Sequence, residues 1–340
     1  MKKSFYLLLI SLFFTLLLLT LASCGGNCFY NIWGSSASDI YAVGAYGNML
    51  HYDGNTWNKI KTPAQHDFRC IWGSSSSDVF VTVINEPIIH YDGKVWKYMD
   101  DITKDCTHIW GTSPSDAYAL QSGGSILHYD GKAWRIIYQN PECMFWDIWG
   151  SSSDVFVAGG NKAGGSFIIV HYDSDTWVET KFPGKPWASL LDIWGSSSSN
   201  VFISGQSSDI FHYDGNTWSQ MDSGAGHGFT DIWGTSSSDV FTIGGHEGDI
   251  YHYDGDAWSL VYNCEDCELW NIWGTSSSDV FVVGGQGIIL YYDGENWSRI
   301  YTGSQASLQD IWGTSPSNVF AVGCGKTILH YDGEAWSKKR

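Results

Sequence analysis

One unit of about 40 residues is written eight times, and this repeat constrains the fold more than any other feature of the sequence. Within each unit, four short apolar runs are separated by Gly, Ser, Asn or Asp, which are typical turn residues. In the last unit the runs are residues 308–312, 319–322, 327–331 and the segment from Trp336 onward. Each unit also contains the tripeptide Ile-Trp-Gly, beginning at Ile32, Ile71, Ile109, Ile148, Ile193, Ile232, Ile272 and Ile311.

Four short strands at this period predict one blade of a β-propeller per unit. We name the strands A to D from the innermost outward. A single blade cannot bury both faces of its sheet, so neighbouring blades must cover it and the ring must close. The sequence therefore predicts an all-β fold, an eight-bladed β-propeller of four-stranded antiparallel blades, as one domain over residues 29–340.

The first residues have the pattern of an export signal. Three residues, Met1-Lys2-Lys3, precede an apolar run over residues 5–20, which ends in Leu21-Ala22-Ser23-Cys24. This tetrapeptide resembles the lipobox of bacterial lipoproteins. The resemblance implies cleavage before Cys24, an acyl lipid such as palmitate on its thiol and, because Gly25 follows, the outer membrane. We predict a lipoprotein signal peptide over residues 1–23 and a lipidated tether over residues 24–28, with a membrane-spanning anchor as the alternative.

The charge of the chain argues against nucleic acid as a partner. The net charge is −18, and removing residues 1–23 would take away two lysines and bring it to about −20. A field of this sign repels phosphate backbones and anionic lipid surfaces. We therefore expect contact with the membrane only through the lipid anchor.

Most of the 19 Trp residues recur at two places in the unit, in Ile-Trp-Gly and at the start of strand D, where packing between blades explains them. Asp or Asn closes the Ser-rich A–B turn and Asp opens the C–D turn, usually after His. We expect the Ser, Asp and Asn residues of these turns to accept hydrogen bonds from amides of their own turns. Calcium is the alternative, but one carboxylate per blade is scattered around the ring, so we predict no metal.

The unit Asp279 to Trp297 resembles the repeats of bacterial propeller lipoproteins. It is also similar to the Asp-box repeat of bacterial neuraminidases and to the propellers of photosystem II assembly factors. The Asp-box match is loose, since Gly215 stands one place early in Tyr213 to Trp218. The resemblance covers the whole chain after the signal and implies a fold far better than a function.

The eight units differ mainly on one side of the predicted disc, which we call the variable face. It carries the B–C turns and D–A connections, and the residue three before each Ile-Trp-Gly Trp is the most diverse. This diversity indicates either a surface adapted to one partner or relaxed packing at a strand end. Three further Trp residues lie in the same connections, as is common at interfaces. The predicted partner-binding residues are Tyr30, Arg69, Trp146, Trp187, Trp270 and Gln309.

Cysteine usage agrees with export. Besides Cys24 the chain has Cys28, Cys70, Cys106, Cys143, Cys264, Cys267 and Cys324, all on the variable face. The chain enters on strand A and leaves on strand D, so no strand joins the first blade to the last. We predict that a disulfide between Cys28 and Cys324 closes this seam and that Cys264 pairs locally with Cys267. Half of a zinc site is the alternative for the second pair.

No catalytic constellation is visible, and we predict neither an enzyme nor a cofactor. A sialidase needs several arginines that converge on a carboxylate, yet Arg135 and Arg299 belong to outer strands. Neither a Gly-x-Ser-x-Gly elbow with a placed His nor a His-Glu-x-x-His motif is present. The sequence favours a scaffold that binds an envelope protein or complex, on the periplasmic or the cell-surface side. A lectin that uses Trp146, Trp187 and Trp270 to stack on a glycan is the alternative.

Overall fold

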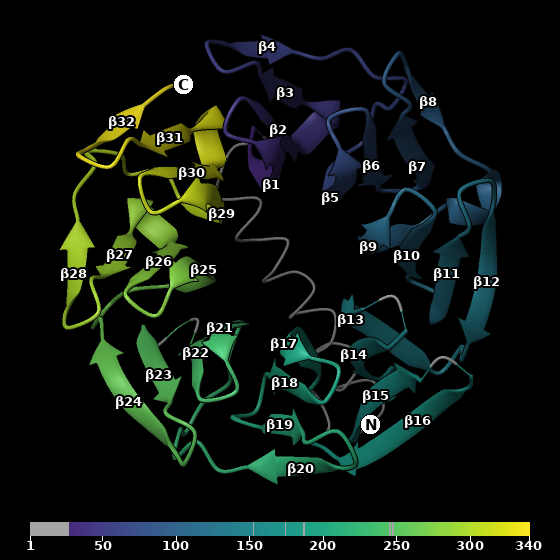
Figure 1. Ribbon diagram of the computed structural model, residues 1–340, viewed down its shortest axis with the longest axis vertical. Coiled ribbons are helices and arrows are strands. Elements are labelled where there is room, and N and C mark those ends of the chain that lie inside the picture. Colours follow the sequence, from purple (N-terminus) through teal and green to yellow (C-terminus); the bar gives the residue numbers. More distant parts are fainter. Residues whose placement is uncertain (1–26, 152, 174, 186–187, 245, 247) are drawn as a thin grey trace, which may run out of the picture.

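The computed structural model describes residues 27–340 except 152, 174, 186–187, 245 and 247. The described chain forms a ring of eight four-stranded antiparallel sheets around a central channel (Figure 1). In every sheet the strands follow chain order from the channel outward. The predicted fold class is confirmed.

The strands of the first four blades are β1 (Phe29–Ser36), β2 (Asp39–Gly44), β3 (Met49–Tyr52) and β4 (Trp57–Lys59); β5 (Phe68–Ser75), β6 (Asp78–Val83), β7 (Glu86–Tyr91) and β8 (Trp96–Tyr98); β9 (Cys106–Ser113), β10 (Asp116–Gln121), β11 (Ser125–Tyr129) and β12 (Trp134–Gln139); and β13 (Cys143–Gly150), β14 (Val155–Asn161), β15 (Ser166–Tyr172) and β16 (Trp177–Pro183).

The strands of the last four blades are β17 (Leu190–Ser197), β18 (Asn200–Gly205), β19 (Ile210–Tyr213) and β20 (Trp218–Met221); β21 (Asp231–Ser236), β22 (Asp239–Gly244), β23 (Asp249–Tyr253) and β24 (Trp258–Asn263); β25 (Leu269–Ser276), β26 (Asp279–Gly284), β27 (Ile289–Tyr292) and β28 (Trp297–Ile300); and β29 (Leu308–Ser315), β30 (Asn318–Gly323), β31 (Ile328–Tyr331) and β32 (Trp336–Lys338).

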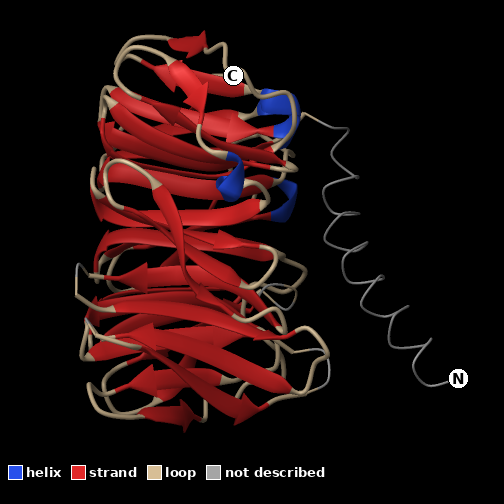
Figure 2. Ribbon diagram, turned by 90° about the vertical axis from the view of Figure 1, so that its right-hand side faces the viewer, coloured by secondary structure: helices blue, strands red, loops and turns tan. Residues whose placement is uncertain are grey.

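The two faces of the disc differ in their connections. The antiparallel order places all A–B and C–D turns on one face and all B–C turns and D–A connections on the other. The short 3₁₀ helices η1 (Ala45–Gly47), η2 (Asp101–Thr103), η3 (Gly285–Gly287) and η4 (Cys324–Lys326) lie in the second set. Figure 2 shows them gathered on one side of the disc, which is the variable face. No helix in the described part of the chain is long and apolar enough to cross a membrane.

The recurring Trp residues pack between blades. A Cβ atom added to Gly73 would lie 2.6 Å from the Trp33 ring of the preceding blade, so only glycine leaves room for that ring. The strand D Trp residues pack the other way, and the Trp57 ring meets the Phe320 ring edge to face at 6.1 Å across the seam. Such aromatic pairs add to the burial of apolar area. The prediction that these residues form the packing between blades is confirmed.

The ring closes between the last blade and the first. Strands β29 and β1 lie side by side (Figure 1) and pack together. One core cluster joins Phe29 and Ile32 of the first blade to Phe320 and Ile328 of the last. As the sequence predicts, the described residues form no strand that is shared across this seam.

Candidate functional site

The variable face surrounds the mouth of the channel with one residue from the start of each strand A. We call these residues the mouth ring. They stand at the diverse position of the repeat, and each of them is at least partly exposed. The ring consists of Tyr30, Arg69, Thr107, Trp146, Leu191, Thr230, Trp270 and Gln309.

A β-bulge explains why this position is free to vary. In β1 the register with β2 shifts between Phe29 and Asn31, which leaves Tyr30 without a cross-strand partner. The same shift occurs at Trp146 of β13 and at Trp270 of β25. A bulged residue escapes the pairing rules of the sheet and often turns its side chain toward a site. The sequence shows the diversity of the position but not this cause.

The structure brings together most of the predicted partner-binding residues. Tyr30, Arg69, Trp146, Trp270 and Gln309 all belong to the mouth ring. Gln309 Nε2 lies 3.8 Å from the sulfur of Cys324, so its side chain reaches toward the B–C connection of its own blade. Trp187 lies outside the described residues, and its place in the site stays a prediction.

Tyr30 is part of a polar group at the edge of the mouth. Burial and the negative charge of Asp67 raise the pKa of Tyr30 to about 12, and its hydroxyl also hydrogen-bonds Asp67. Asp67 in turn accepts a hydrogen bond from the Tyr46 amide at 2.8 Å. Burial and the positive charge of Arg69 lower the pKa of His108 to about 4, so its ring is neutral at physiological pH. This sector of the mouth therefore presents a neutral phenol and a neutral imidazole around one guanidinium.

Deeper in the channel, the next residue of strand A holds adjacent blades together. The inward edge of strand A has no neighbouring strand, so its amide groups need other acceptors. The backbone amide of the Ile in Ile-Trp-Gly donates its hydrogen bond to a carboxylate or side-chain amide oxygen of the preceding blade. The pairs are Asp310 Oδ2 with Ile32 N (2.8 Å), Asn31 Oδ1 with Ile71 N (3.0 Å), Asp147 Oδ2 with Ile193 N (3.1 Å), Asp192 Oδ2 with Ile232 N (2.7 Å) and Asp231 Oδ2 with Ile272 N (2.8 Å).

These carboxylates also make the centre of the channel acidic. Burial raises the pKa of Asp147 to about 6 and that of Asp310 to about 7. Burial and the neighbouring carboxylates also raise the pKa of Asp192, which hydrogen-bonds both Asp147 and Asp231. Carboxyl groups from three adjacent blades thus form one hydrogen-bonded chain. Among the described residues, no three His, Cys, Asp or Glu side chains are arranged to hold a metal ion.

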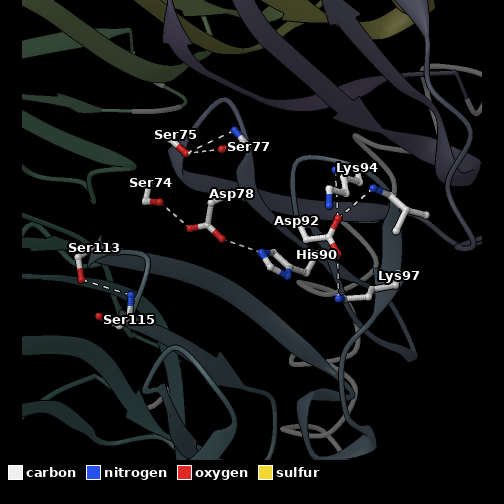
Figure 3. A network of polar contacts seen from close by, with 11 residues as sticks. Ser74, Ser75, Ser77, Asp78, His90, Asp92, Lys94, Lys97, Ser113 and Ser115 are labelled. Atoms are coloured by element: carbon white, nitrogen blue, oxygen red, sulfur yellow. Dashed lines mark hydrogen bonds and ion pairs between the residues drawn. The ribbon is translucent and has the colours of Figure 1, made fainter.

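The opposite face carries a Ser-Asp-His group in the second blade (Figure 3). Ser74 Oγ donates to Asp78 Oδ2 at 2.5 Å, and His90 Nε2 lies 2.7 Å from Asp78 Oδ1. The His90 ring stacks on Phe80 with centroids 4.0 Å apart. Most other blades repeat this arrangement, with Thr in place of Ser at Thr112 and Thr235 and Asn in place of Asp at Asn200 and Asn318. In the seventh blade the Tyr291 hydroxyl donates to Asp279 at 2.9 Å in place of the histidine.

This group has the wrong order for nucleophilic catalysis. Activation of a serine requires His next to the hydroxyl and Asp behind the His. Here Asp78 stands between Ser74 and His90, so the imidazole is not placed to take the hydroxyl proton. Its repetition around the ring agrees with a structural role, in which the group joins the A–B turn to strand C.

The expected hydrogen bonding from turn amides is confirmed for the Asp of the C–D turns and for the Ser of the A–B turns, where Ser36 Oγ accepts from the Ser38 amide at 3.3 Å. It is wrong for Asp39. In the C–D turns Asp53 Oδ1 accepts from the amides of Asn55 and Thr56, as predicted. In the A–B turns Asp39 instead accepts from the Ser35 hydroxyl and contacts His51. The spacing of 12 residues from this position to the His of strand C, which most blades share, was the signal for the cross-strand pair.

Replacing Asp78 with Ala is expected to lower the free energy of unfolding by about 1–3 kcal/mol, because it leaves His90 and Ser74 without their shared acceptor. Chemical denaturation measures the change. The control is Val95→Ala in the neighbouring C–D turn, where the side chain is 55% exposed and the expected change is within about 0.5 kcal/mol. Equal effects of the two substitutions would contradict the structural role.

The cysteines of the variable face form two pairs. The structure joins Cys28 to Cys324 across the seam and Cys264 to Cys267 within one D–A connection. Cys70, Cys106 and Cys143 are in no disulfide among the described residues. Cys70 Sγ lies 3.7 Å from the Ile109 carbonyl oxygen, at the place where every other blade except the third, which has His108, uses Asp or Asn. Cys24 lies outside the described residues.

Comparisons with known proteins extend the fold but not the function. No protein-family model and no curated protein matches the chain. The solved structure of YCF48 bound to D1 peptide is similar at 15% identity and a TM-score of 0.59, over 78% of this chain and 93% of that one. BamB from Moraxella catarrhalis is similar at 11% identity and a TM-score of 0.64, over 90% and 94%. The computationally designed Ika8 protein is similar at 13% identity and a TM-score of 0.71, over 90% of this chain and 96% of that one.

Proposed function

We propose that this protein is a lipid-anchored scaffold of the outer membrane that binds another envelope protein through the mouth ring and is not an enzyme. The observation that carries the proposal is the β-bulge at the mouth ring. In seven of the eight blades it frees the mouth-ring residue from pairing. The exception is Thr230, whose amide donates to the Ile243 carbonyl oxygen. The residues at this position differ around the ring, whereas their neighbours repeat. The aromatic members Tyr30, Trp146 and Trp270 are of the types that dominate binding energy at protein interfaces.

The charge of the channel favours a cationic contact from the partner. The carboxyl groups of Asp147, Asp192, Asp231 and Asp310 stand next to the mouth ring in sequence and in the channel. A Lys or Arg side chain that enters the mouth would stabilise their ionised forms. We therefore expect the partner segment to carry a basic residue at its tip and the binding to weaken as salt is added.

The repeated groups of the A–B turns support the view that the chain is not an enzyme. Their acidic residue stands between the hydroxyl and the His, and they recur around the ring, as expected of a structural role. One of the similar structures, YCF48, was solved with D1 peptide bound. We extend from it only the idea that a propeller of this shape can receive a segment of another protein. The lipobox-like sequence ending in Cys24 supports export and lipid anchoring.

The test is co-purification from solubilised envelopes with the wild type and a Tyr30→Ala, Trp146→Ala, Trp270→Ala variant. We expect a protein recovered with the wild type to fall at least tenfold with the variant, because three aromatic contacts of a binding surface are lost. Tyr301→Ala is the matched control, since Tyr301 is 82% exposed on the same face but outside the mouth ring.

Thermal unfolding must first show that the variant folds as the wild type does. Equal recovery of the partner with all three proteins would contradict the proposed surface. Quenching of Trp fluorescence and thermal stabilisation by a glycan, with no protein partner recovered, would instead establish the lectin function.

A further inference from the structure

The described chain begins at the centre of the variable face. Every strand A starts on this face beside the channel, and β1 lies at the inner rim (Figure 1). Cys28, just before β1, is bonded to Cys324 of η4. The Asn27 carbonyl oxygen accepts a hydrogen bond from the Lys326 amide at 2.7 Å. The chain is therefore fixed to the disc from Asn27 onward, close to the mouth ring.

Only two residues, Gly25 and Gly26, separate Asn27 from Cys24. A fully extended chain spans at most ~3.6 Å per residue, so Cys24 lies within about 11 Å of Asn27. The eight residues of β1 make the disc about 26 Å thick. A lipid on Cys24 therefore holds the centre of the variable face within reach of the headgroups and keeps the opposite face far from them.

The distribution of charge agrees with this orientation. The opposite face carries one Asp in every C–D turn and an Asp in most A–B turns, with few basic residues among them (Lys94, Lys97, Lys132 and Arg135). Such a face is repelled by anionic lipid. The variable face is acidic as well, with carboxylates such as Asp67, Asp101, Glu142 and Glu265 in its connections, but it holds more of the basic residues than the opposite face. The basic residues in its connections and at the chain end are Lys61, Lys104, Lys162, Lys185, Lys326, Lys339 and Arg340.

We propose that the variable face lies against the membrane and that its partner is a loop of an integral membrane protein. This inference rests on the lipid anchoring proposed above. A gap of about 11 Å admits a loop but no separate folded domain, whose diameter exceeds ~25 Å at 100 residues. The mixed charge and the individual mouth residues fit a protein surface, whereas a lipid surface is uniform and selects no single side chain at each blade.

The first test measures depth. Lipidated protein is reconstituted into vesicles of phosphatidylethanolamine and phosphatidylglycerol (3:1) that carry an energy acceptor in the headgroups. A fluorescent amino acid replaces either Tyr301 on the variable face or Val95 on the opposite face, both of them exposed. We expect energy transfer from position 301 to exceed that from position 95 several-fold. Equal transfer, or stronger transfer from position 95, would overturn the orientation.

Two variants separate this inference from the proposed anchoring. Cys24→Ala is expected to abolish vesicle binding, and a wild type that does not bind vesicles would overturn both proposals. A Gly/Ser insert of 20 residues after Gly26 adds a mean reach of about 25 Å. We expect this variant to stay bound to the vesicles while the difference between positions 301 and 95 disappears. Persistence of the difference would show that something other than the tether sets the orientation.

The second test identifies the class of partner. A photo-crosslinking amino acid in place of Tyr46, which is 67% exposed in η1 and whose amide bonds Asp67 beside Tyr30, is activated in intact envelopes. We expect adducts with a protein that resists alkaline extraction from the membrane, and none from position 95. Adducts with lipid alone, or with a protein released by alkali, would overturn the assignment of the partner.

Discussion

Replacing Cys28 and Cys324 together with Ser is expected to lower the free energy of unfolding by about 5 kcal/mol under oxidising conditions. The disulfide joins residues 296 positions apart, so it closes almost the whole chain into one loop and restricts the unfolded state strongly. It also lies at the seam, where the first and last blades are otherwise joined by packed side chains and by hydrogen bonds such as that from the Lys326 amide to the Asn27 carbonyl oxygen. Denaturant titration of the oxidised wild type and the double variant measures the difference.

The second cysteine pair provides the control. Cys264 and Cys267 are three positions apart, so their disulfide closes a very short loop. The corresponding double Ser variant is expected to lose only about 2 kcal/mol. Peptide mapping without reductant checks both pairings directly. Equal losses from the two double variants, or a reductant that leaves the wild type unchanged, would contradict the role of the seam disulfide.

The architecture was predictable because each blade repeats the same physical problem. Alternation, turn residues and a period of about 40 residues specify the strands, and burial of both faces of a blade requires a closed ring. The seam pairing of Cys28 with Cys324 also follows from this topology, since both residues must lie on one face of neighbouring blades. The distribution of variable residues over one face could be read in the same way.

The details of the site were less accessible to sequence. The β-bulge at Tyr30 and Trp146 depends on the register between two strands, which no local pattern records. The pairing of Asp39 with His51 joins residues of different strands, and local turn chemistry suggested other partners. The sequence showed that the residue before Ile-Trp-Gly is mostly Asp or Asn. It did not show the reason, because the amide group that donates to this side chain belongs to the next blade of the closed ring.

The carboxyl groups of the channel have a consequence for pH dependence. Their pKa values in the folded protein lie above the ordinary 3.8, at about 6 for Asp147 and about 7 for Asp310, mainly because of burial. The folded state therefore favours their protonated forms. That contribution to stability is complete below about pH 4 and is lost as the pH rises through 6 to 7. Buried histidines such as His108, whose pKa is lowered, act in the opposite sense, so a single substitution is needed to separate the two.

Asp192→Asn is the substitution that isolates the carboxyl groups. Asp192 lies between Asp147 and Asp231 and accepts the Ile232 amide at 2.7 Å. The first blade shows that Asn serves in this place, because Asn31 Oδ1 accepts the Ile71 amide at 3.0 Å. The new amide can keep that bond and donate both of its hydrogens to the flanking carboxylates without adding charge.

We therefore expect Asp192→Asn to raise the melting temperature at pH 7.5 by several degrees, at roughly 2–4 °C per kcal/mol, and the gain to fade toward pH 4 as the wild-type carboxyl group takes up its proton. The control is Asp53→Asn, the same chemical change in a C–D turn, where hydrogen bonds from the amides of Thr56 and Asn55 lower the pKa of the carboxyl group. There the ionised form is the favoured one, so the substitution is expected to lower the melting temperature slightly at pH 7.5.

A loss of stability in both variants, or a gain in Asp192→Asn that does not depend on pH, would show that the channel carboxylates are not a source of strain at neutral pH. The sign of the change thus distinguishes a carboxyl group that is buried against its neighbours from one that is stabilised by its own turn.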